Sequence, residues 1–286
     1  MRELTMKRIV FYLKVLLFFV VALSTYGEQN AAALSLRAPC EYPGGKGCLR
    51  GKYGYIDKAG DIVIPLQFKE AHSFSEGFAA VEIHARWGYI DKTGKVVVPA
   101  QFIQVLDFSE GLAAVRINNE WGYIDNTGAI IIELKFDAVK SFREGLAAVW
   151  INREWGYIDN TGAIIIESKF DDVKSFHEGL AAVEINERWG YVDKAGKIVI
   201  QPQFTQAYDF SEGLASVRVK PENSEGKYGY INKRGEIIIK PEYPSAVDFS
   251  EGLAAVYKKS ENRDVYIDKA GQKGFNNEFL GAYSFS

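Results

Sequence analysis

The sequence has 286 residues, of which 47% are hydrophobic and 25% are charged, and its formal net charge is −3. This composition excludes a wholly disordered chain. The mildly acidic balance argues against the broad basic surface that nucleic-acid binding needs, so no nucleic-acid partner is expected.

Residues 1–27 have the layout of a secretory signal peptide. Arg2, Lys7 and Arg8 precede an apolar run at residues 9–23, and small residues follow that run. The run is short for a membrane span. We therefore expect a secreted, periplasmic or cell-envelope protein. The alternative is an uncleaved anchor, which would be the only route of this chain to a membrane.

The segment 28–51 contains the only two cysteines, Cys40 and Cys48, on either side of a turn-rich loop. In an oxidising compartment this pair predicts a disulfide. A two-cysteine metal site is the alternative, but it needs further ligands, and the nearest histidine, His72, lies within the region described next. We expect the disulfide and no metal.

From residue 52 onward the chain repeats about every 34 residues. Each unit opens with an aromatic residue in the pattern Trp-Gly-Tyr-Ile-Asp and later contains Phe-Ser-Glu-Gly-Leu-Ala-Ala-Val. A fixed period of this size indicates one supersecondary element per unit, stacked in an array. The opening tryptophans are Trp87, Trp121, Trp155 and Trp189, and Tyr53 lies 34 residues before the first.

Each unit begins with a predicted β-hairpin. Residues 87–91 are rich in aromatic and β-branched types and predict a strand. Residues 91–94 (Asp-Lys-Thr-Gly) predict a turn, because aspartate accepts from its own backbone two residues on and glycine provides a positive φ. Residues 96–98 form the return strand, which we expect to end at Pro99 because proline cannot donate to a ladder.

A third strand follows in each unit. After a short irregular piece, residues 109–111 (Ser-Glu-Gly) predict a second tight turn and residues 112–117 predict a strand. Both faces of these strands are apolar, whereas a sheet with one wet face would alternate. Each sheet is therefore expected to be covered on both faces by neighbouring units.

Several positions recur in register, and we expect core and turn roles for them rather than chemical ones. An aromatic residue recurs fifteen residues after the opening aromatic, a phenylalanine at twenty-one and a glycine at twenty-four. The structural positions singled out are Trp87, Trp121, Trp155, Trp189, Gly111, Gly145 and Gly179.

These recurring segments resemble those of WG-repeat proteins, also called KWG repeats. The resemblance covers about residues 50–286, and the opening aromatic departs to tyrosine at Tyr53 and Tyr228. It implies a bacterial-type β-repeat module of largely undefined biochemical role, and it transfers no catalytic residues.

The predicted fold class is all-β, with six and a half to seven antiparallel units over residues 52–286. Residues 282–286 match the stretch that precedes the Gly-Leu-Ala-Ala-Val strand, and residues 33–37 resemble that missing strand. Pairing of the two ends would protect sheet edges. A β-propeller-like ring is therefore favoured. An open superhelical β-solenoid is the alternative, because 34 residues is short for a four-stranded blade.

No catalytic motif is present in the sequence. His72, His84 and His177 do not share a metal-binding spacing, and no His-Glu-x-x-His, Gly-x-Ser-x-Gly or phosphate-binding glycine loop occurs. The recurring acids are explained by turn chemistry rather than by the paired carboxylates of a glycosidase. We predict structural histidines, no catalytic residue and no cofactor.

Departures from the repeat are better candidates for binding. Trp150 stands where sister units carry glutamate or arginine, so we expect an exposed tryptophan that can contact a sugar or a protein. An inserted loop that breaks the repeat is a second candidate for a specific contact with a partner. Its residues are Pro221, Glu222, Asn223, Ser224 and Glu225.

We therefore expect a non-catalytic scaffold that binds an unknown protein or glycan outside the cytoplasm. One alternative is a carbohydrate-active or other hydrolase with a site at the mouth of a β ring, which the abundance of carboxylates favours. A purely structural envelope component is the other.

Overall fold

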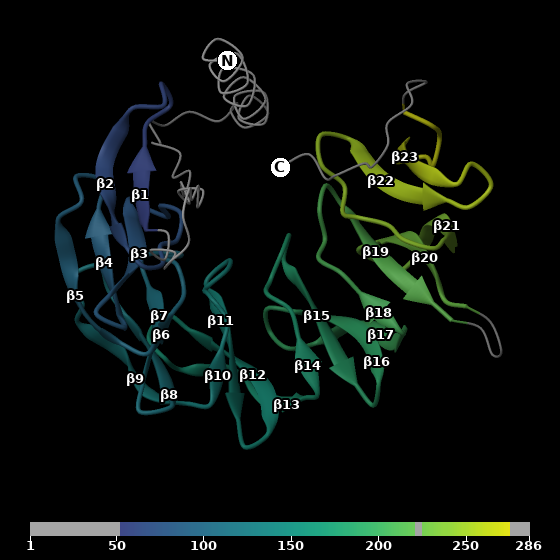
Figure 1. Cartoon of the computed structure of the whole chain (residues 1–286). Helices are drawn as coiled ribbons and strands as arrows, with labels where there is room; N and C mark the ends of the chain where they lie inside the picture. Colours follow the sequence, from purple (N-terminus) through teal and green to yellow (C-terminus); the bar gives the residue numbers. More distant parts are fainter. Residues whose placement is uncertain (1–51, 221–224, 275–286) are drawn as a thin grey trace, which may run out of the picture. The chain divides into compact units, whose positions relative to one another are not determined.

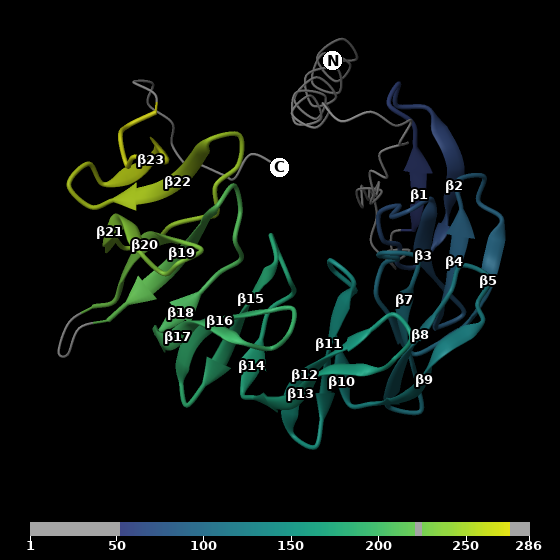
Figure 2. The same cartoon turned by 180° about the vertical axis from the view of Figure 1, so that it is seen from behind.

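The computed structural model describes residues 52–220 and 225–274, and every regular element in these ranges is a β-strand (Figure 1). The strands form antiparallel sheets that follow one another in chain order, as the view from behind also shows (Figure 2). The predicted all-β class is confirmed. Within the described ranges no helix has the length and apolarity to cross a membrane. The signal-like segment 1–27, the Cys40–Cys48 loop and the chain ends that would close a ring lie outside them.

One four-stranded sheet represents the others. It contains β6 (Gln104–Val105), β7 (Ala113–Ile117), β8 (Glu120–Ile124) and β9 (Ile130–Phe136), hydrogen-bonded in that order. We call it the type sheet. The three following sheets have the same order: β10 (Ala138–Val139), β11 (Leu146–Ile151), β12 (Glu154–Asp159) and β13 (Ile164–Phe170); β14 (Asp172–Val173), β15 (Leu180–Ile185), β16 (Arg188–Asp193) and β17 (Ile198–Phe204); β18 (Gln206–Ala207), β19 (Leu214–Val219), β20 (Lys227–Asn232) and β21 (Ile237–Tyr243).

The sheets at either end of the described residues have fewer strands. The first two pair β1 (Tyr53–Ile56) with β2 (Ile62–Phe68), and β3 (Phe78–Ile83) with β4 (Arg86–Asp91) and β5 (Val96–Phe102); the last pairs β22 (Leu253–Lys258) with β23 (Arg263–Asp268).

The sheets do not coincide with the sequence units. Ala114 of β7 pairs with Tyr123 of β8, so the third strand of one unit joins the opening hairpin of the next. Part of the piece expected to be irregular forms β6. The return strand β5 also does not end at Pro99, but continues to Phe102. Proline is tolerated there because β5 is an edge strand, where its missing N–H is not needed.

The Trp-Gly pair marks an irregular crossing of two strands. Trp121 pairs with Phe136 and Tyr123 with Ile132, so a step of two residues on β8 corresponds to four on β9, which is a bulge. A Cβ atom on Gly122 would lie 2.5 Å from the carbonyl oxygen of Ile132. Only glycine permits this close approach of two backbones.

The apolar core lies between sheets. Leu112, Ala114 and Tyr123 of the type sheet pack against Ala147 and Val149 of the following sheet. The alternate residues of β7 pack towards the preceding sheet. The expectation that neighbouring units cover both faces is therefore confirmed.

Alanine at Gly156, the equivalent of Gly122 one repeat on, tests the crossing. Its Cβ would lie 2.6 Å from the carbonyl oxygen of Ile166, so we expect a loss of about 3 kcal/mol in the free energy of unfolding. Gly145→Ala is the matched control, because Gly145 has φ 85° and open space around it. Because the backbone at this position is left-handed, alanine there should lower the free energy of unfolding by about 1–2 kcal/mol without any steric clash. Equal losses in urea unfolding would contradict the steric explanation.

Candidate binding surface

A buried hydrogen bond positions the first segment of each sheet on the sheet before it. The Tyr123 hydroxyl donates to the carbonyl oxygen of Lys140 at 2.8 Å, and the tyrosine is fully buried. Burial raises the pKa of Tyr123 far above its ordinary value, so the hydroxyl keeps its proton. The same bond recurs from Tyr55, Tyr89, Tyr157, Tyr191 and Tyr230 to the carbonyl oxygens of His72, Leu106, Lys174, Tyr208 and Val247.

The residue whose carbonyl accepts this hydrogen bond differs between sheets, and in several sheets its side chain contacts the half-buried opening aromatic of the same sheet. Nζ of Lys140 lies 5.4 Å from the ring centroid of Trp155, a cation–π distance. The ring centroids of His72 and Trp87 are 4.9 Å apart. We call each opening aromatic with its surrounding side chains a platform, and the set of them the platform row. Similar contacts join Lys174 to Trp189 and Tyr208 to Tyr228.

A second variable side chain lies across the strand pair from each opening aromatic. In the type sheet it is Arg116, which pairs with Trp121 and donates from Nη1 to Oε1 of Gln104 at 2.7 Å. Two sheets later it is Glu184, whose pKa is raised by burial and by the neighbouring Asp172. The residue opposite the opening aromatic thus changes from one sheet to the next. The set is Glu82, Arg116, Trp150, Glu184 and Arg218.

Trp150 occupies this second position in the platform of Trp155. The two ring centroids are 5.3 Å apart with an interplanar angle of 64°, an edge-to-face contact. Trp150 is half-buried, so the expectation of an exposed tryptophan was wrong. Its ring lies against its cross-strand neighbour, which covers part of its surface.

The inserted loop ends beside another platform. Residues 221–224 lie outside the described ranges, and Glu225 is exposed. Gly226 is buried against Arg218, because a Cβ on this glycine would lie 2.6 Å from Nε of the arginine. The described end of the loop thus adjoins the platform of Tyr228, whereas Trp150 belongs to a different sheet. Of the residues predicted for the two sites, the described ones, Trp150 and Glu225, are therefore not brought together.

Comparison with known proteins identifies the repeat. A family model described as WG containing repeat matches residues 53–84, 87–121, 121–152, 155–189, 189–220 and 228–260. The chain belongs to this family. A search of curated proteins found no match.

The WG-repeat sheets also resemble solved propeller-like structures. A crystal structure of the eukaryotic initiation factor is 11% identical with a TM-score of 0.57, over 86% of this chain and 84% of that one. The dihydro-heme d1 dehydrogenase NirN in complex with DHE is 12% identical with a TM-score of 0.51, over 88% of this chain and 64% of that one. At such identities the likeness concerns the fold alone, which is propeller-like.

The recurring glutamate of each WG repeat links turns of neighbouring repeats. The Glu76 carboxylate accepts the backbone N–H groups of Glu110 and Gly111 at 2.7 and 2.9 Å. Both sets of acids thus have turn roles, as expected: the glutamates accept from the turn of the next repeat, and the aspartates accept within their own turn, as Asp125 does from Thr127 N at 2.9 Å. The turn glycines have the expected positive φ, among them Gly111, Gly145 and Gly179.

Two of the three histidines bridge adjacent WG repeats. Nδ1 of His72 lies 2.8 Å from Oδ1 of Asp107, and Nδ1 of His177 lies 3.3 Å from Oδ2 of Asp209. The contact with Asp107 raises the pKa of His72, and the contact with Asp209 raises that of His177. These contacts agree with the structural role expected for both histidines.

Sequence reasoning missed a polar pair at Ser216 and Asp248. Ser216 is fully buried where sister repeats have alanine, and its hydroxyl donates to Oδ1 of Asp248 at 3.2 Å. Burial and the nearby Asp209 raise the pKa of Asp248, and a cavity of about 410 Å³ adjoins it. The change from alanine to serine was the available signal. Within the described ranges, no group of three or more histidine, cysteine or acidic side chains is placed to hold a metal ion.

Phenylalanine at Tyr123 tests the bond between sheets. We expect Tyr123→Phe to lower the free energy of unfolding by about 1–2 kcal/mol, because the carbonyl of Lys140 loses its buried donor. Tyr257→Phe is the control, since its hydroxyl bonds Asn262 in an exposed position. If Tyr123→Phe lowered the free energy of unfolding no more than the control does, the hydrogen bond would contribute little to stability.

The His72–Asp107 pair predicts a pH dependence of stability. The folded-state pKa of His72 lies above the ordinary 6.5, so the pair stabilises fully below that pH and is lost as pH rises through the folded value. Both side chains are more than a third exposed, which limits the gain to about 1 kcal/mol. We expect the advantage of the natural chain over His72→Leu, the residue of the next repeat, to shrink between about pH 5.5 and pH 8.5 in urea unfolding. If the difference in free energy of unfolding between the two proteins did not change with pH, the ion pair would be excluded as the source of that difference.

Proposed function

We propose that this protein is a non-catalytic scaffold that binds a protein partner through the platform row. One observation carries the proposal. In these five sheets the opening residue is always aromatic and half-buried, tryptophan in four and tyrosine in one, while the residue opposite it changes from sheet to sheet through glutamate, arginine, tryptophan, glutamate and arginine. A position needed only for folding would favour one residue type, whereas a recognition surface differs along its length.

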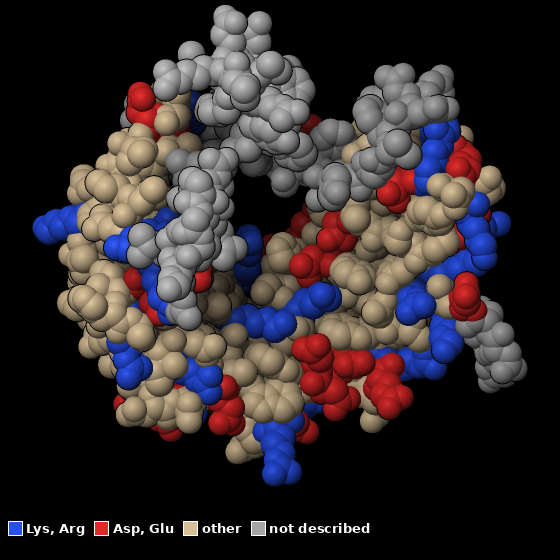
Figure 3. Space-filling model, in the orientation of Figure 1, with Lys and Arg blue, Asp and Glu red and all other residues tan. Residues whose placement is uncertain are grey.

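The residue types in the row suit a protein partner. Tryptophan and arginine are the types most often found at binding hot spots. Alternating charges would fix the register of a partner rather than simply attract it. Figure 3 shows acidic and basic side chains intermixed over the face that it presents. This mixture supports specific recognition rather than attraction to a uniformly charged polymer.

The proposed place of action is outside the cytoplasm. Its support is the signal-like segment at residues 1–27 and the cysteine pair of residues 28–51. Cell fractionation with detection of the processed chain tests it, and an unprocessed cytoplasmic chain would contradict it.

Site-specific photo-cross-linking tests the binding surface. A photoreactive residue at Arg116 in the row should capture a defined partner, whereas one at Asn160, exposed in the turn at the opposite end of β12 from Trp155, should not. Equal capture from both positions would refute the role of the row. A glycan array in parallel would reveal a glycan in place of a protein.

Arginine at Trp150 tests the energetic centre of the row. Sister repeats carry Arg116 and Arg218 at this position, so Trp150→Arg is compatible with the fold. We expect at least about 10-fold weaker binding of the captured partner, as for a hot-spot aromatic. Asn160→Arg is the control. Unchanged affinity in Trp150→Arg would remove this platform from the interface.

A hydrolase is the second candidate, and one observation favours it. Asp248 is kept in a site that disfavours its charge, beside a second acid and a cavity of about 410 Å³. A raised carboxyl pKa is what a general acid needs. Turnover of a glycoside or ester that Asp248→Asn abolishes would support this function. Absence of turnover across a broad panel of glycosides and esters would argue against the hydrolase and in favour of the scaffold function.

A further inference from the structure

β9 forms an edge of the type sheet that is open to a further strand. Among the strands of residues 52–220 and 225–274 it pairs only with β8. Ile130 and Ile131 on this strand are 54% and 45% exposed. An exposed apolar edge strand is a template on which another extended strand can add by backbone hydrogen bonds. β9 thus combines an unpaired backbone edge with exposed apolar side chains.

The backbone of Glu133 directs its N–H group to this edge. A Cβ atom on Gly122 of β8 would lie 2.5 Å from the carbonyl oxygen of Ile132, so this carbonyl points towards β8. The peptide bond that follows is trans, and in a planar trans peptide the carbonyl and the next N–H point in opposite directions. The N–H of Glu133 therefore points away from β8, where the carbonyl of an added strand can accept it.

Most strands equivalent to β9 carry a proline at this place. The residue equivalent to Glu133 is Pro65 in β2 and Pro99 in β5, and the residue after that position is proline in β17 and β21. Proline on an edge strand is one of the devices that keep other strands from pairing with it. Among the described strands of this type, only β9 and β13 lack it.

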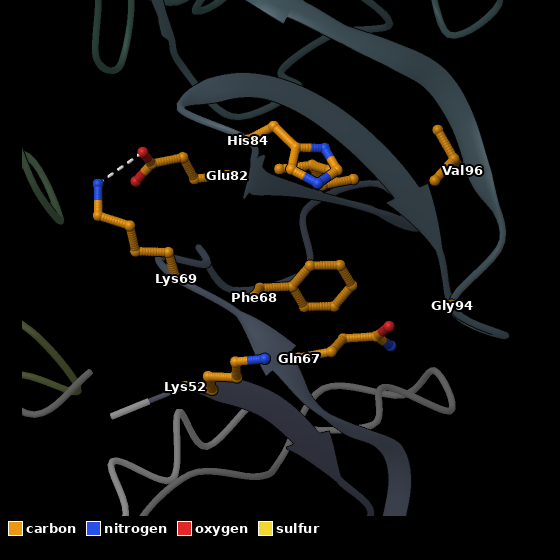
Figure 4. A pocket seen from close by; sticks show the side chains of 9 residues that line it. Lys52, Gln67, Phe68, Lys69, Glu82, His84, Gly94 and Val96 are labelled. Atoms are coloured by element: carbon orange, nitrogen blue, oxygen red, sulfur yellow. Dashed lines mark hydrogen bonds and ion pairs between the residues drawn. The ribbon is translucent and has the colours of Figure 1, made fainter. Parts of the chain in front are cut away.

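β2 shows the usual form of the strand. Beyond Pro65, its residue equivalent to Lys135 is the neutral Gln67. Figure 4 shows Gln67 among the residues that line a cavity of about 520 Å³ beside this strand. β2 thus has neither the outward N–H group of β9 nor its charges.

The exposed charges of β9 complement those of a second β9. Glu133 and Lys135 are both exposed, and the half-buried Leu134 lies between them. Antiparallel pairing of two copies about Leu134 places Glu133 of each copy opposite Lys135 of the other, which gives two ion pairs related by a two-fold axis. The two Leu134 side chains then lie directly opposite each other and add an apolar contact at the centre.

β13 and β21 share only part of this pattern. β13 has the charges as Glu167 and Lys169, but the residue between them is Ser168, which provides no apolar contact at the centre. β21 has its two charges in the opposite order, with Pro241 between them. The unblocked, self-complementary edge with an apolar centre is thus a property of β9 and not of the repeat.

We propose that a second copy of this chain pairs with β9 through its own β9, so that two type sheets join into one continuous antiparallel sheet. The strand has seven residues, so the contact is small and the dimer is weak. A dimer presents two platform rows, which raises the avidity for a partner that has two matching sites. This proposal goes beyond the scaffold function, because it concerns a contact between copies and does not use the residues opposite the opening aromatics.

Sedimentation equilibrium of the purified full chain over a range of concentrations tests the proposal. We expect a monomer–dimer equilibrium with a dissociation constant in the micromolar range. Glu133→Pro should weaken the dimer at least about 10-fold, because it removes the outward N–H and one charge of each ion pair. The fold accepts proline here, since Pro65 and Pro99 occupy the same position. Glu167→Pro makes the same change in β13 and is the matched control, which should leave the dimer unchanged.

Two charge variants test the register of the pairing. Glu133→Lys and Lys135→Glu should each weaken self-association at least about 10-fold, because like charges then lie opposite each other. A mixture of the two variants should form a heterodimer, since both lysines of one copy then face both glutamates of the other. Native mass spectrometry distinguishes the heterodimer from either homodimer once the two chains differ in isotope content.

Three outcomes would overturn the proposal. They are a natural chain that stays monomeric at all concentrations tested, equal dimer affinity in Glu133→Pro and Glu167→Pro, and a mixture of the charge variants that forms no heterodimer. None of these outcomes affects capture from position 116, so failure here is distinguishable from failure of the scaffold function.

Discussion

The structure depends on one part-buried hydrogen bond, which the tyrosine of each opening strand donates to a backbone carbonyl in the first segment of the next sheet. Tyr123 and its counterparts place this bond in the apolar layer between sheets, where an unpaired carbonyl would be costly. The bond fixes where the next sheet starts. The Glu76-type contacts between turns add a second link at the surface. Each repeat therefore positions the next one through polar contacts of fixed geometry at an otherwise apolar interface.

This arrangement separates residues that must stay constant from residues that are free to vary. The tyrosine hydroxyl binds a backbone carbonyl, so the side chain of the accepting residue is unconstrained, and it differs among His72, Leu106, Lys140 and Lys174. The same freedom applies opposite each opening aromatic. A chain of this kind can change its surface one repeat at a time without altering the core, which is the physical basis for treating the platform row as a recognition surface.

The sequence alone predicted the period, the antiparallel strands and the covering of both faces, because strands that are apolar on both faces, in place of alternating, report that both faces are buried. It did not predict the sheet boundaries, since apolar residues do not show whether strand 112–117 pairs with the hairpin before it or after it. It misjudged Trp150, because an unusual residue at a polar position can fold onto a cross-strand neighbour. The partner of Glu76 lies 34 residues away, and no local motif reports such a contact.

The left-handed turn residues show how much variation the repeat accepts at its surface. Among non-glycine residues, left-handed backbone recurs at the Glu76-type position and at both central positions of the turn between the third strand and the next opening strand, such as Asn118 and Asn119. Glu76, at φ 52°, uses its carboxylate to bind the next turn, and the asparagines of the sister repeats tolerate the conformation intrinsically. His84 takes the same conformation as the sister asparagines, and histidine shares their enrichment in left-handed backbone. The second position of this turn varies even more, because Ala85, Arg153 and Glu187 all occupy it with left-handed backbone, so the turn can exchange residues without altering the strands on either side.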